Sequence, residues 1–188
     1  SAQDINSMFN GATIFNNGGQ PLNWDEKLSN VTNINGIFSR TSLFNQPIGN
    51  WNTSNITNIK YIFDRATAFN QNIGGWDTSS VIEADAAFRG ASAFNQDLSN
   101  WDITNINSAS EMFSGSGQNS ANAEATNASW QTQDSSSPAA QESERSIPGE
   151  PMIINIDLDL PNTYSQTNND WGLIHQAIPG NLPSNRSD

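Results

Sequence analysis

The chain has 188 residues and a formal net charge of −12, from 19 acidic and 7 basic residues. Only 35% of its residues are hydrophobic and 14% are charged, so uncharged polar residues dominate, with 28 Asn among them. Leu, Ile, Val and Phe together lie near the ~20% of residues below which chains tend to stay disordered. We therefore expect one domain with a tail, instead of a conventional core that fills the whole length.

The acidic balance argues against two kinds of partner. Nucleic-acid-binding proteins use clustered Lys and Arg to displace counterions from phosphates, and seven scattered basic residues do not form such a cluster. The same scarcity argues against an anionic membrane surface, and no apolar run of about 18 residues could cross a bilayer. The chain has no Cys, so it has no disulfide framework and no thiolate metal site.

A 25-residue internal repeat dominates the first part of the chain. Two full units run from Phe44 to Ala68 and from Phe69 to Ala93, and a third begins at Phe94. Equivalent residues of stacked repeats fall in register, so each set is expected to form a column. The predicted columns are Trp51, Trp76 and Trp101; Phe44, Phe69 and Phe94; Phe38, Phe63, Phe88 and Phe113; and Asn45, Asn70 and Asn95.

Each unit is predicted to contain a short extended segment and about two helical turns. Residues 56–63 place Ile and Phe at the spacing of one helix face, and Thr53 and Ser54 are suited to cap its start. Residues 69–73 are extended in character, and parallel pairing would stack such segments about 4.8 Å apart. The expected fold class is a repeat solenoid of four to five turns over residues 1–113, with short parallel strands and short helices.

The first unit departs from this pattern. Trp24 follows Phe15 by nine residues, where the later units have seven, and Val31 follows Trp24 by seven, where they have five. Insertions of this polar composition suit surface loops. Residues 5–9 match residues 59–63, so the chain begins inside a repeat, either because upstream turns were removed or because the first turn is a partial cap.

Two polar columns invite a functional interpretation. The Asn45 column is assigned a structural role, because an Asn side chain can bond to neighbouring backbones as both donor and acceptor. For Asn52, Asp77 and Asp102 the favoured interpretation is helix capping on an exposed edge, and the alternative is a calcium ladder of carboxylate oxygens. No dense D-x-D-x-D loop supports calcium, so we expect no cofactor.

The repeat resembles a known family. Residues Phe44–Ile59 read F-N-Q-P-I-G-N-W-N-T-S-N-I-T-N-I, and Phe94–Ile106 read F-N-Q-D-L-S-N-W-D-I-T-N-I. These motifs are similar to the ~25-residue bacterial surface-protein repeat of mycoplasma lipoproteins and lactobacillus surface proteins, which is related to BspA-like leucine-rich repeats. The resemblance covers about residues 2–113. It implies a leucine-rich-repeat-like solenoid on an exposed surface, and it carries over no catalytic residue.

The rest of the chain differs in composition. Residues 114–150 are rich in Ser, Ala, Asn and Gln with Trp130 as the one large residue, which predicts a flexible or extended linker with Trp130 as a candidate anchor. Residues 151–188 are predicted to be a docking segment, with a strand at 152–160 and a short helix at 171–178. The strand could cap the last solenoid turn or join a sheet of another chain. The candidate docking residues are Met152, Ile154, Ile156, Leu158, Leu160 and Trp171.

Catalytic motifs are scarce. His175 is the only His, and no nucleophile elbow, P-loop or dinucleotide fingerprint occurs. We expect no enzyme, but a surface-exposed adhesion or structural protein, extracellular or on a cell or virion surface. Its expected partners are protein neighbours in a larger assembly and a host protein or glycan. The alternatives are a self-contained secreted binding module and, more weakly, a carbohydrate-active enzyme on a solenoid.

Overall fold

The chain divides into two units, Ser1–Met152 and Ile153–Asp188, and the computed structural model describes residues 3–147 of the first unit. This part is mostly irregular backbone around a large buried aromatic core, and it contains no strand. Two α-helices follow at its C-terminal end, α1 (Ser120–Asp134) and α2 (Pro138–Arg145). Two short 3-10 helices, η1 (Asn17–Gly19) and η2 (Asp25–Leu28), lie in the first repeat.

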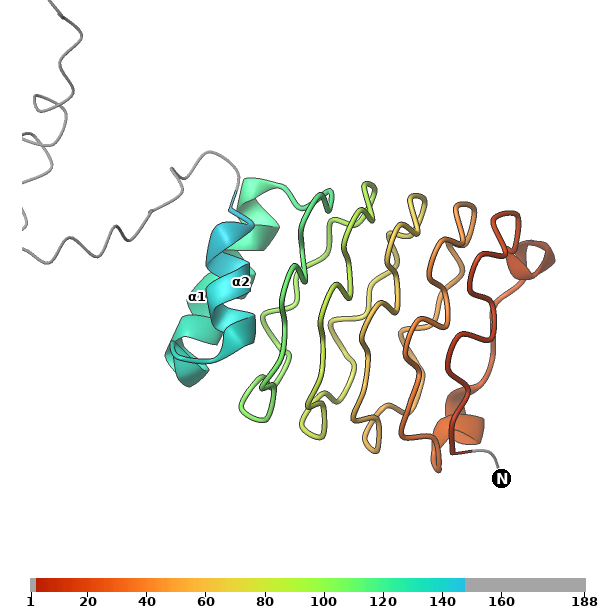
Figure 1. The fold of residues 1–188 in the computed structure, drawn as a ribbon, viewed down its shortest axis with the longest axis horizontal. Helices are drawn as coiled ribbons and strands as arrows, with labels where there is room; N and C mark the ends of the chain where they lie inside the picture. Colours follow the sequence, from red (N-terminus) through yellow and green to blue (C-terminus); the bar gives the residue numbers. More distant parts are fainter. Residues whose placement is uncertain (1–2, 148–188) are drawn as a thin grey trace, which may run out of the picture. The chain divides into compact units, whose positions relative to one another are not determined.

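The repeats fold as coils that lie side by side, with α1 and α2 against the last one (Figure 1). Isolated parallel bridges join each coil to the next: Asp4 to Asn33, Asn33 to Asn58, Asn58 to Glu83, and Glu83 to Ser108. We number the coils 1 to 5 by these bridge residues. Asn33, Asn58, Glu83 and Ser108 are 25 residues apart, so the repeat period of the sequence is also the spatial period.

After each bridge, every second backbone N–H donates to the next coil. In coil 3 the N–H groups of Ile59, Tyr61, Phe63 and Arg65 donate to the carbonyls of Glu83, Asp85, Ala87 and Arg89 at 2.6–2.9 Å. The intervening N–H groups stay within coil 3: that of Lys60 donates to Asn58 Oδ1, and those of Ile62, Asp64 and Ala66 donate to carbonyls three residues earlier. Every backbone donor from 59 to 66 therefore has a partner, which accounts for the stability of backbone without regular secondary structure.

The helix predicted over residues 56–63 is wrong. Tyr61 and Arg65 have φ of 55° and 56°, and each is the third residue of a four-residue turn, where a type II turn needs positive φ. A helix would direct each N–H to a carbonyl four residues back, whereas here alternate N–H groups join the next coil. A helix face would bury the same four apolar side chains, so their spacing does not distinguish a helix from these turns. The four are Ile56, Ile59, Ile62 and Phe63.

The predicted strands are wrong as well. Residues 69–73 contain no strand or bridge, and the parallel pairing occurs at Asn58 and the residues after it. The segment after Phe69 is held by side chains instead, because the N–H of Asn70 donates to Asn45 Oδ1 of the preceding coil. Side-chain bonds replace backbone ladder bonds on this side of the coil.

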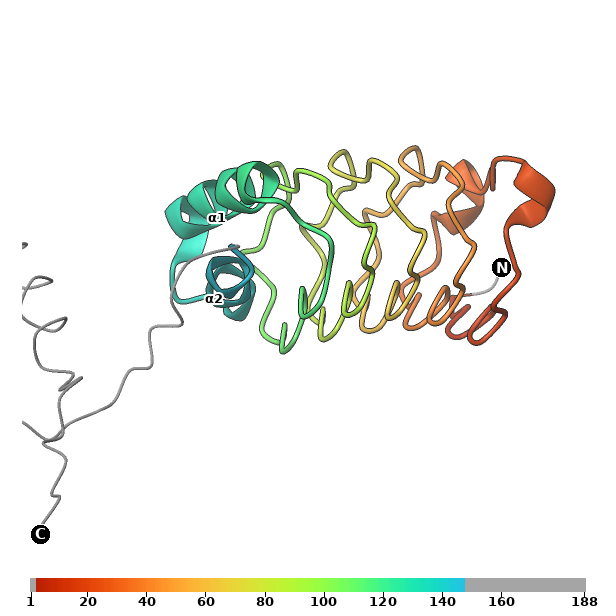
Figure 2. The ribbon, with the colours of Figure 1, turned by 90° about the horizontal axis from the view of Figure 1, so that it is seen from above.

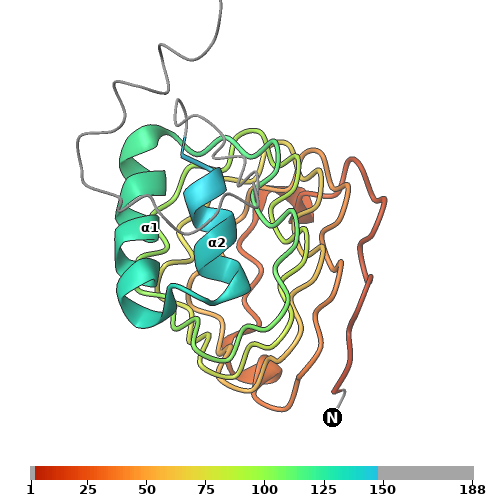
Figure 3. The same ribbon diagram turned by 60° about the vertical axis from the view of Figure 1, so that its left-hand side comes forward.

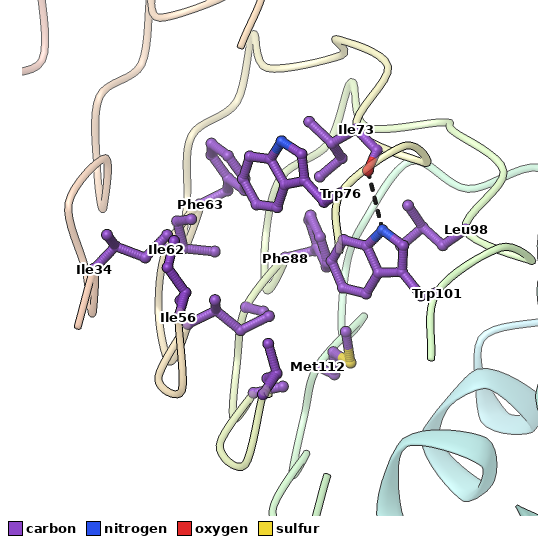
Figure 4. Close-up of a cluster of buried hydrophobic side chains, with 14 of the residues drawn as sticks. Ile34, Ile56, Ile62, Phe63, Ile73, Trp76, Phe88, Leu98, Trp101 and Met112 are labelled. Atoms are coloured by element: carbon purple, nitrogen blue, oxygen red, sulfur yellow. Dashed lines mark hydrogen bonds between the residues drawn. The ribbon is translucent and has the colours of Figure 1, made fainter. Parts of the chain in front are cut away.

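The core is built from aromatic columns that run through the coils. Within coil 3 the rings of Phe63 and Phe69 stack with centroids 3.7 Å apart. Between coils, the centroids of Trp76 and Trp101 are 6.2 Å apart and the rings are nearly parallel, at 8°. Figure 4 shows these Trp rings beside Phe63 and Phe88, with Ile and Leu side chains filling the space around them. Nearly all of this surface is removed from water, which is the main source of stability in such a stack.

The linker predicted over 114–150 is wrong for the residues that the structure describes. Helix α1 begins at an N-cap in which the Asn119 side chain accepts from the Asn122 N–H, and Ser137 caps α2 by accepting from Ala139 N–H. The two helices cover the end of the stack (Figures 2 and 3). They bury mostly small side chains on a core that already exists, so they need little apolar content of their own: Ala123, Thr126, Ala139, Ala140 and Ser143, besides Trp130.

The docking segment predicted over 151–188 lies outside the described residues, and so do its strand at 152–160, its helix at 171–178 and its candidate docking side chains. Within residues 3–147, no helix is long and apolar enough to cross a membrane.

Candidate functional site

The Asn column connects coil to coil through side chains. Asn45 Oδ1 accepts the N–H of Asn70 at 2.9 Å, and Asn70 Oδ1 accepts the N–H of Asn95 at 2.8 Å. The Gln that follows each Asn donates its Nε2 to the same oxygen, as Gln71 does to Asn45 Oδ1 at 3.0 Å. These side chains are therefore engaged in structure, and they are not free for a ligand.

The Trp column is held in the same way. The indole Nε1 groups of Trp51, Trp76 and Trp101 donate to backbone carbonyls of the preceding coil at 2.8–3.0 Å. Trp130 extends this column beyond the residues predicted from the sequence, because its indole donates to Leu98 O at 3.0 Å in the same manner. The Asn column is likewise longer than predicted, because Asn16 and Asn119 extend it at its two ends. The sequence carries a signal for the buried position of Trp130, because it is the one large side chain in a polar segment.

The Asn52, Asp77 and Asp102 column closes local turns. Each Oδ1 accepts the backbone N–H and the hydroxyl of the residue two positions later, as Asp102 does from Thr104 at 2.9 and 2.6 Å. These two bonds lower the pKa of Asp102 below its ordinary value. The predicted helix caps are wrong, because no helix follows them. Among residues 3–147, no three His, Asp or Glu side chains gather where they could hold a metal ion.

A network of ion pairs crosses the outer side of coils 3 to 5. Lys60 Nζ lies 3.4 Å from Glu83 and 3.0 Å from Asp85, and Arg89 lies 2.8 Å from both Asp64 and Glu111. Burial acts to raise the pKa of Asp85, but hydrogen bonds from Ser108, Lys60 and Ser110 outweigh it and lower the pKa. The bonds to Asp85 and Glu83 raise the pKa of Lys60, and those to Asp64 and Glu111 raise the pKa of Arg89. The network locks neighbouring coils together on the face that carries the parallel bridges.

An open cleft of about 380 Å³ lies where the inserted loop of the first repeat meets the next coils. The loop is held there because the Trp51 indole donates to Leu22 O. Four amide side chains and one carboxylate line the cleft together with apolar residues, which suits a ligand that presents hydroxyl or amide groups. The lining residues are Pro21, Asn23, Asp25, Pro47, Ile48, Gly49, Asn50, Gln71 and Asn72.

The comparisons with known proteins identify a family and no individual relative. No curated protein and no solved structure matches the chain significantly. One family model, described as "Mycoplasma protein of unknown function, DUF285", matches residues 3–130. This range includes the coils and α1 as far as Trp130. Since the match covers more than half of the chain, the protein belongs to the DUF285 family.

Proposed function

We propose that the chain is a non-enzymatic, surface-exposed adhesion or structural repeat protein, attached to a larger assembly such as a cell envelope or virion through its C-terminal segment. Its coils are then a leucine-rich-repeat-like solenoid of the bacterial surface-protein type. Neighbouring proteins in the assembly and a host protein or glycan are the proposed partners.

The observation that carries this proposal is the repeated use of polar side chains to hold one coil to another. The Asn, Gln and Trp columns, and the buried Thr53 and Thr78 hydroxyls, all donate to or accept from a neighbouring coil. Such a stack is rigid and presents a repetitive polar surface. These properties suit a protein that acts by contact.

Attachment through the C-terminal segment is supported by the end of the stack. Trp130 of α1 is fully buried against the last coil, and Ala139 and Ala140 of α2 are buried as well. The aromatic core therefore has a cap already. The apolar alternation at 152–160, which predicts a half-buried strand, is not needed for that purpose, and this favours the alternative in which it joins another chain.

A second candidate function is a self-contained secreted binding module, which the polar cleft beside the inserted loop favours. An enzyme on a solenoid has weaker support. Glycoside hydrolysis normally uses a pair of carboxyl groups, and Asp25 is the one carboxylate that lines the cleft among residues 3–147.

The test of attachment is removal of residues 148–188 from the chain in the cells or particles that carry it. We expect the truncated chain to keep the circular dichroism and urea unfolding of the full chain but to be lost from the envelope or particle fraction. Retention of the truncated chain at the full-length level would refute attachment. If it binds host cells after release into the medium, the secreted-module alternative is favoured.

A further inference from the structure

Two arginines that pair with no carboxylate of residues 3–147 occupy neighbouring coils in a chain of net charge −12. Arg40 and Arg65 occupy equivalent positions of coils 2 and 3, and the Arg40 N–H donates to the carbonyl of Asp64, the neighbour of Arg65, at 2.7 Å. Both side chains are exposed, and neither forms an ion pair with a carboxylate of residues 3–147. Like charges at adjacent positions of paired backbones repel each other.

The nearby carboxylates are engaged elsewhere. Lys60 contacts Glu83 and Asp85, and Arg89 contacts Asp64 and Glu111. Of the five basic residues in coils 2 to 4, Lys60 and Arg89 thus share four carboxylates, while Arg40, Arg65 and, in η2, Lys27 pair with no carboxylate of residues 3–147. An anion supplied from outside would relieve the repulsion between them.

The backbone at these positions adds a second observation. Arg40 and Arg65 have φ of 59° and 56°, while coils 1, 4 and 5 have Gly at the equivalent positions, with φ of 67–76°. Glycine takes this conformation without the steric cost that a side chain brings. Gly90 also leaves room for the stem of Arg65, because a Cβ there would lie 3.2 Å from Arg65 Cγ. Arginine therefore occupies two positions that the repeat fills with glycine elsewhere, and no contact within residues 3–147 accounts for the choice.

We propose that Arg40 and Arg65 form an anion-binding pair for the sulfate or carboxylate group of an acidic polysaccharide. This deepens the proposed adhesion function and rests on it. Two guanidinium groups can each offer paired N–H donors to one oxyanion, in the geometry that arginine favours.

The surroundings favour a polysaccharide over an acidic peptide. Tyr61, 39% exposed, lies four residues before Arg65. Arg89 covers one face of its ring, with Cζ 5.6 Å from the ring centroid, and the other face can pack against a sugar. Ser42 and Thr67 follow the two arginines by two residues, and the exposed Thr67 hydroxyl, which donates to Ser42 O at 3.3 Å, can still accept from a sugar hydroxyl. A peptide that adds to a sheet edge needs free backbone donors, and those of residues 59–66 are all bonded.

The experiment measures binding of the full chain to dextran sulfate, polygalacturonate, uncharged dextran and poly-glutamate of matched length by titration calorimetry. The test variant is Arg40→Gly with Arg65→Gly, which installs the residue that other coils carry and should leave the urea midpoint unchanged. The control, Lys27→Ala with Arg145→Ala, alters the net charge equally but lies in η2 and α2. We expect an acidic polysaccharide to bind, the test variant to bind ~10-fold more weakly or worse, and the control to stay within about twofold.

In the calorimetry, the proposal would be overturned by no binding of either acidic polysaccharide, by equal weakening in the test and control variants, or by binding of poly-glutamate at least as tight. The last result would indicate an acidic protein partner. An assay of attachment to host cells distinguishes failure of the arginine pair from failure of the proposed adhesion function. Undiminished attachment of the glycine variant would refute the arginine pair alone, whereas polysaccharide binding without any cell attachment would refute adhesion alone.

Discussion

The indole ring of Trp130 in α1 stacks on Trp101 with ring centroids 6.4 Å apart, and its Nε1 donates to Leu98 O at 3.0 Å. Trp101 makes the same bond, to Ile73 O at 3.0 Å, one coil earlier. Helix α1 therefore gives the last coil the ring and the donor that another coil would give. Asn119 does the same for the Asn column, since its N–H donates to Asn95 Oδ1 at 3.0 Å. The cap therefore makes the ring and hydrogen-bond contacts of a further coil, although its backbone is helical.

Trp130→Ala is expected to destabilise the chain by about 3–5 kcal/mol, the usual cost of removing a large buried aromatic side chain. Trp130→Phe keeps a ring over Trp101 but loses the indole donor, so its loss should be smaller. Urea unfolding followed by far-UV circular dichroism measures both. An alanine variant within about 1 kcal/mol of the wild type would show that α1 does not cap the core.

Two adjacent glycines provide a matched pair. A Cβ on Gly74 would lie 2.8 Å from the carbonyl oxygen of Asp97 in the next coil, whereas a Cβ on Gly75 would meet nothing within 4 Å. Gly74→Ala should therefore cost about 1–3 kcal/mol through displacement of the coils. Gly75→Ala should be neutral or stabilising by up to about 1 kcal/mol, because it restricts the unfolded chain. Equal urea midpoints for the two variants would contradict the close approach of coils at Gly74.

The Asn column can be tested at Asn45, whose Oδ1 accepts from Asn70 N–H and Gln71 Nε2 at 2.9 and 3.0 Å. Asn45→Ala leaves both donors without this acceptor and should cost about 1–3 kcal/mol. Asn45→Asp retains an acceptor oxygen and should cost less. Asn100→Ala, at an exposed position, serves as the control for loss of an Asn side chain. If alanine and aspartate at residue 45 were equally destabilising, the acceptor role would be excluded.

Acid sensitivity follows from Asp102, whose pKa is lowered by its bonds from Thr104. A carboxylate with a lower pKa in the folded state stabilises the fold above its ordinary value of 3.8, and this contribution disappears as the pH falls through the folded-state value. Asp102→Asn should keep the turn, since Asn52 makes the equivalent bonds in coil 3, and should lie within about 1 kcal/mol of wild type at pH 7. Its loss of stability between pH 5 and pH 2 should be smaller than that of the wild type, as measured by urea unfolding at each pH. An identical loss in both chains would contradict a stabilising role for the carboxylate.

Much of the core could be predicted from residue spacing. The Trp and Phe residues that recur every 25 residues lie in stacked columns, because a periodic sequence on a periodic backbone places like residues together. The backbone between them could not be predicted in the same way. Consecutive type II turns and a helix both bury residues 56, 59, 62 and 63, and Tyr61 and Arg65 give no hint of positive φ, since glycine is the usual signal for it.

The two helices that cap the stack could not be predicted from their composition. Helices α1 and α2 carry Ala, Ser and Thr at their buried positions, a composition that would not support a separate core. They are stable because the last coil offers Trp101 and Phe113 as a surface to cover. The equivalent Thr side chains of coils 3 and 4 have no counterpart in the last coil, because they bond to a coil that follows. Thr53 and Thr78 donate to the carbonyls of Asp77 and Asp102 in the following coils, and coil 5, with no coil after it, has Ile103 at that position.

Exposure on the surface is the property on which the proposed adhesion function depends, and antibody labelling of the native cells or particles measures it directly. Antibodies raised against residues 3–147 should label intact, unpermeabilised cells or particles, and protease added outside should remove the labelling. Labelling that requires permeabilisation and survives external protease would contradict a surface role for this chain.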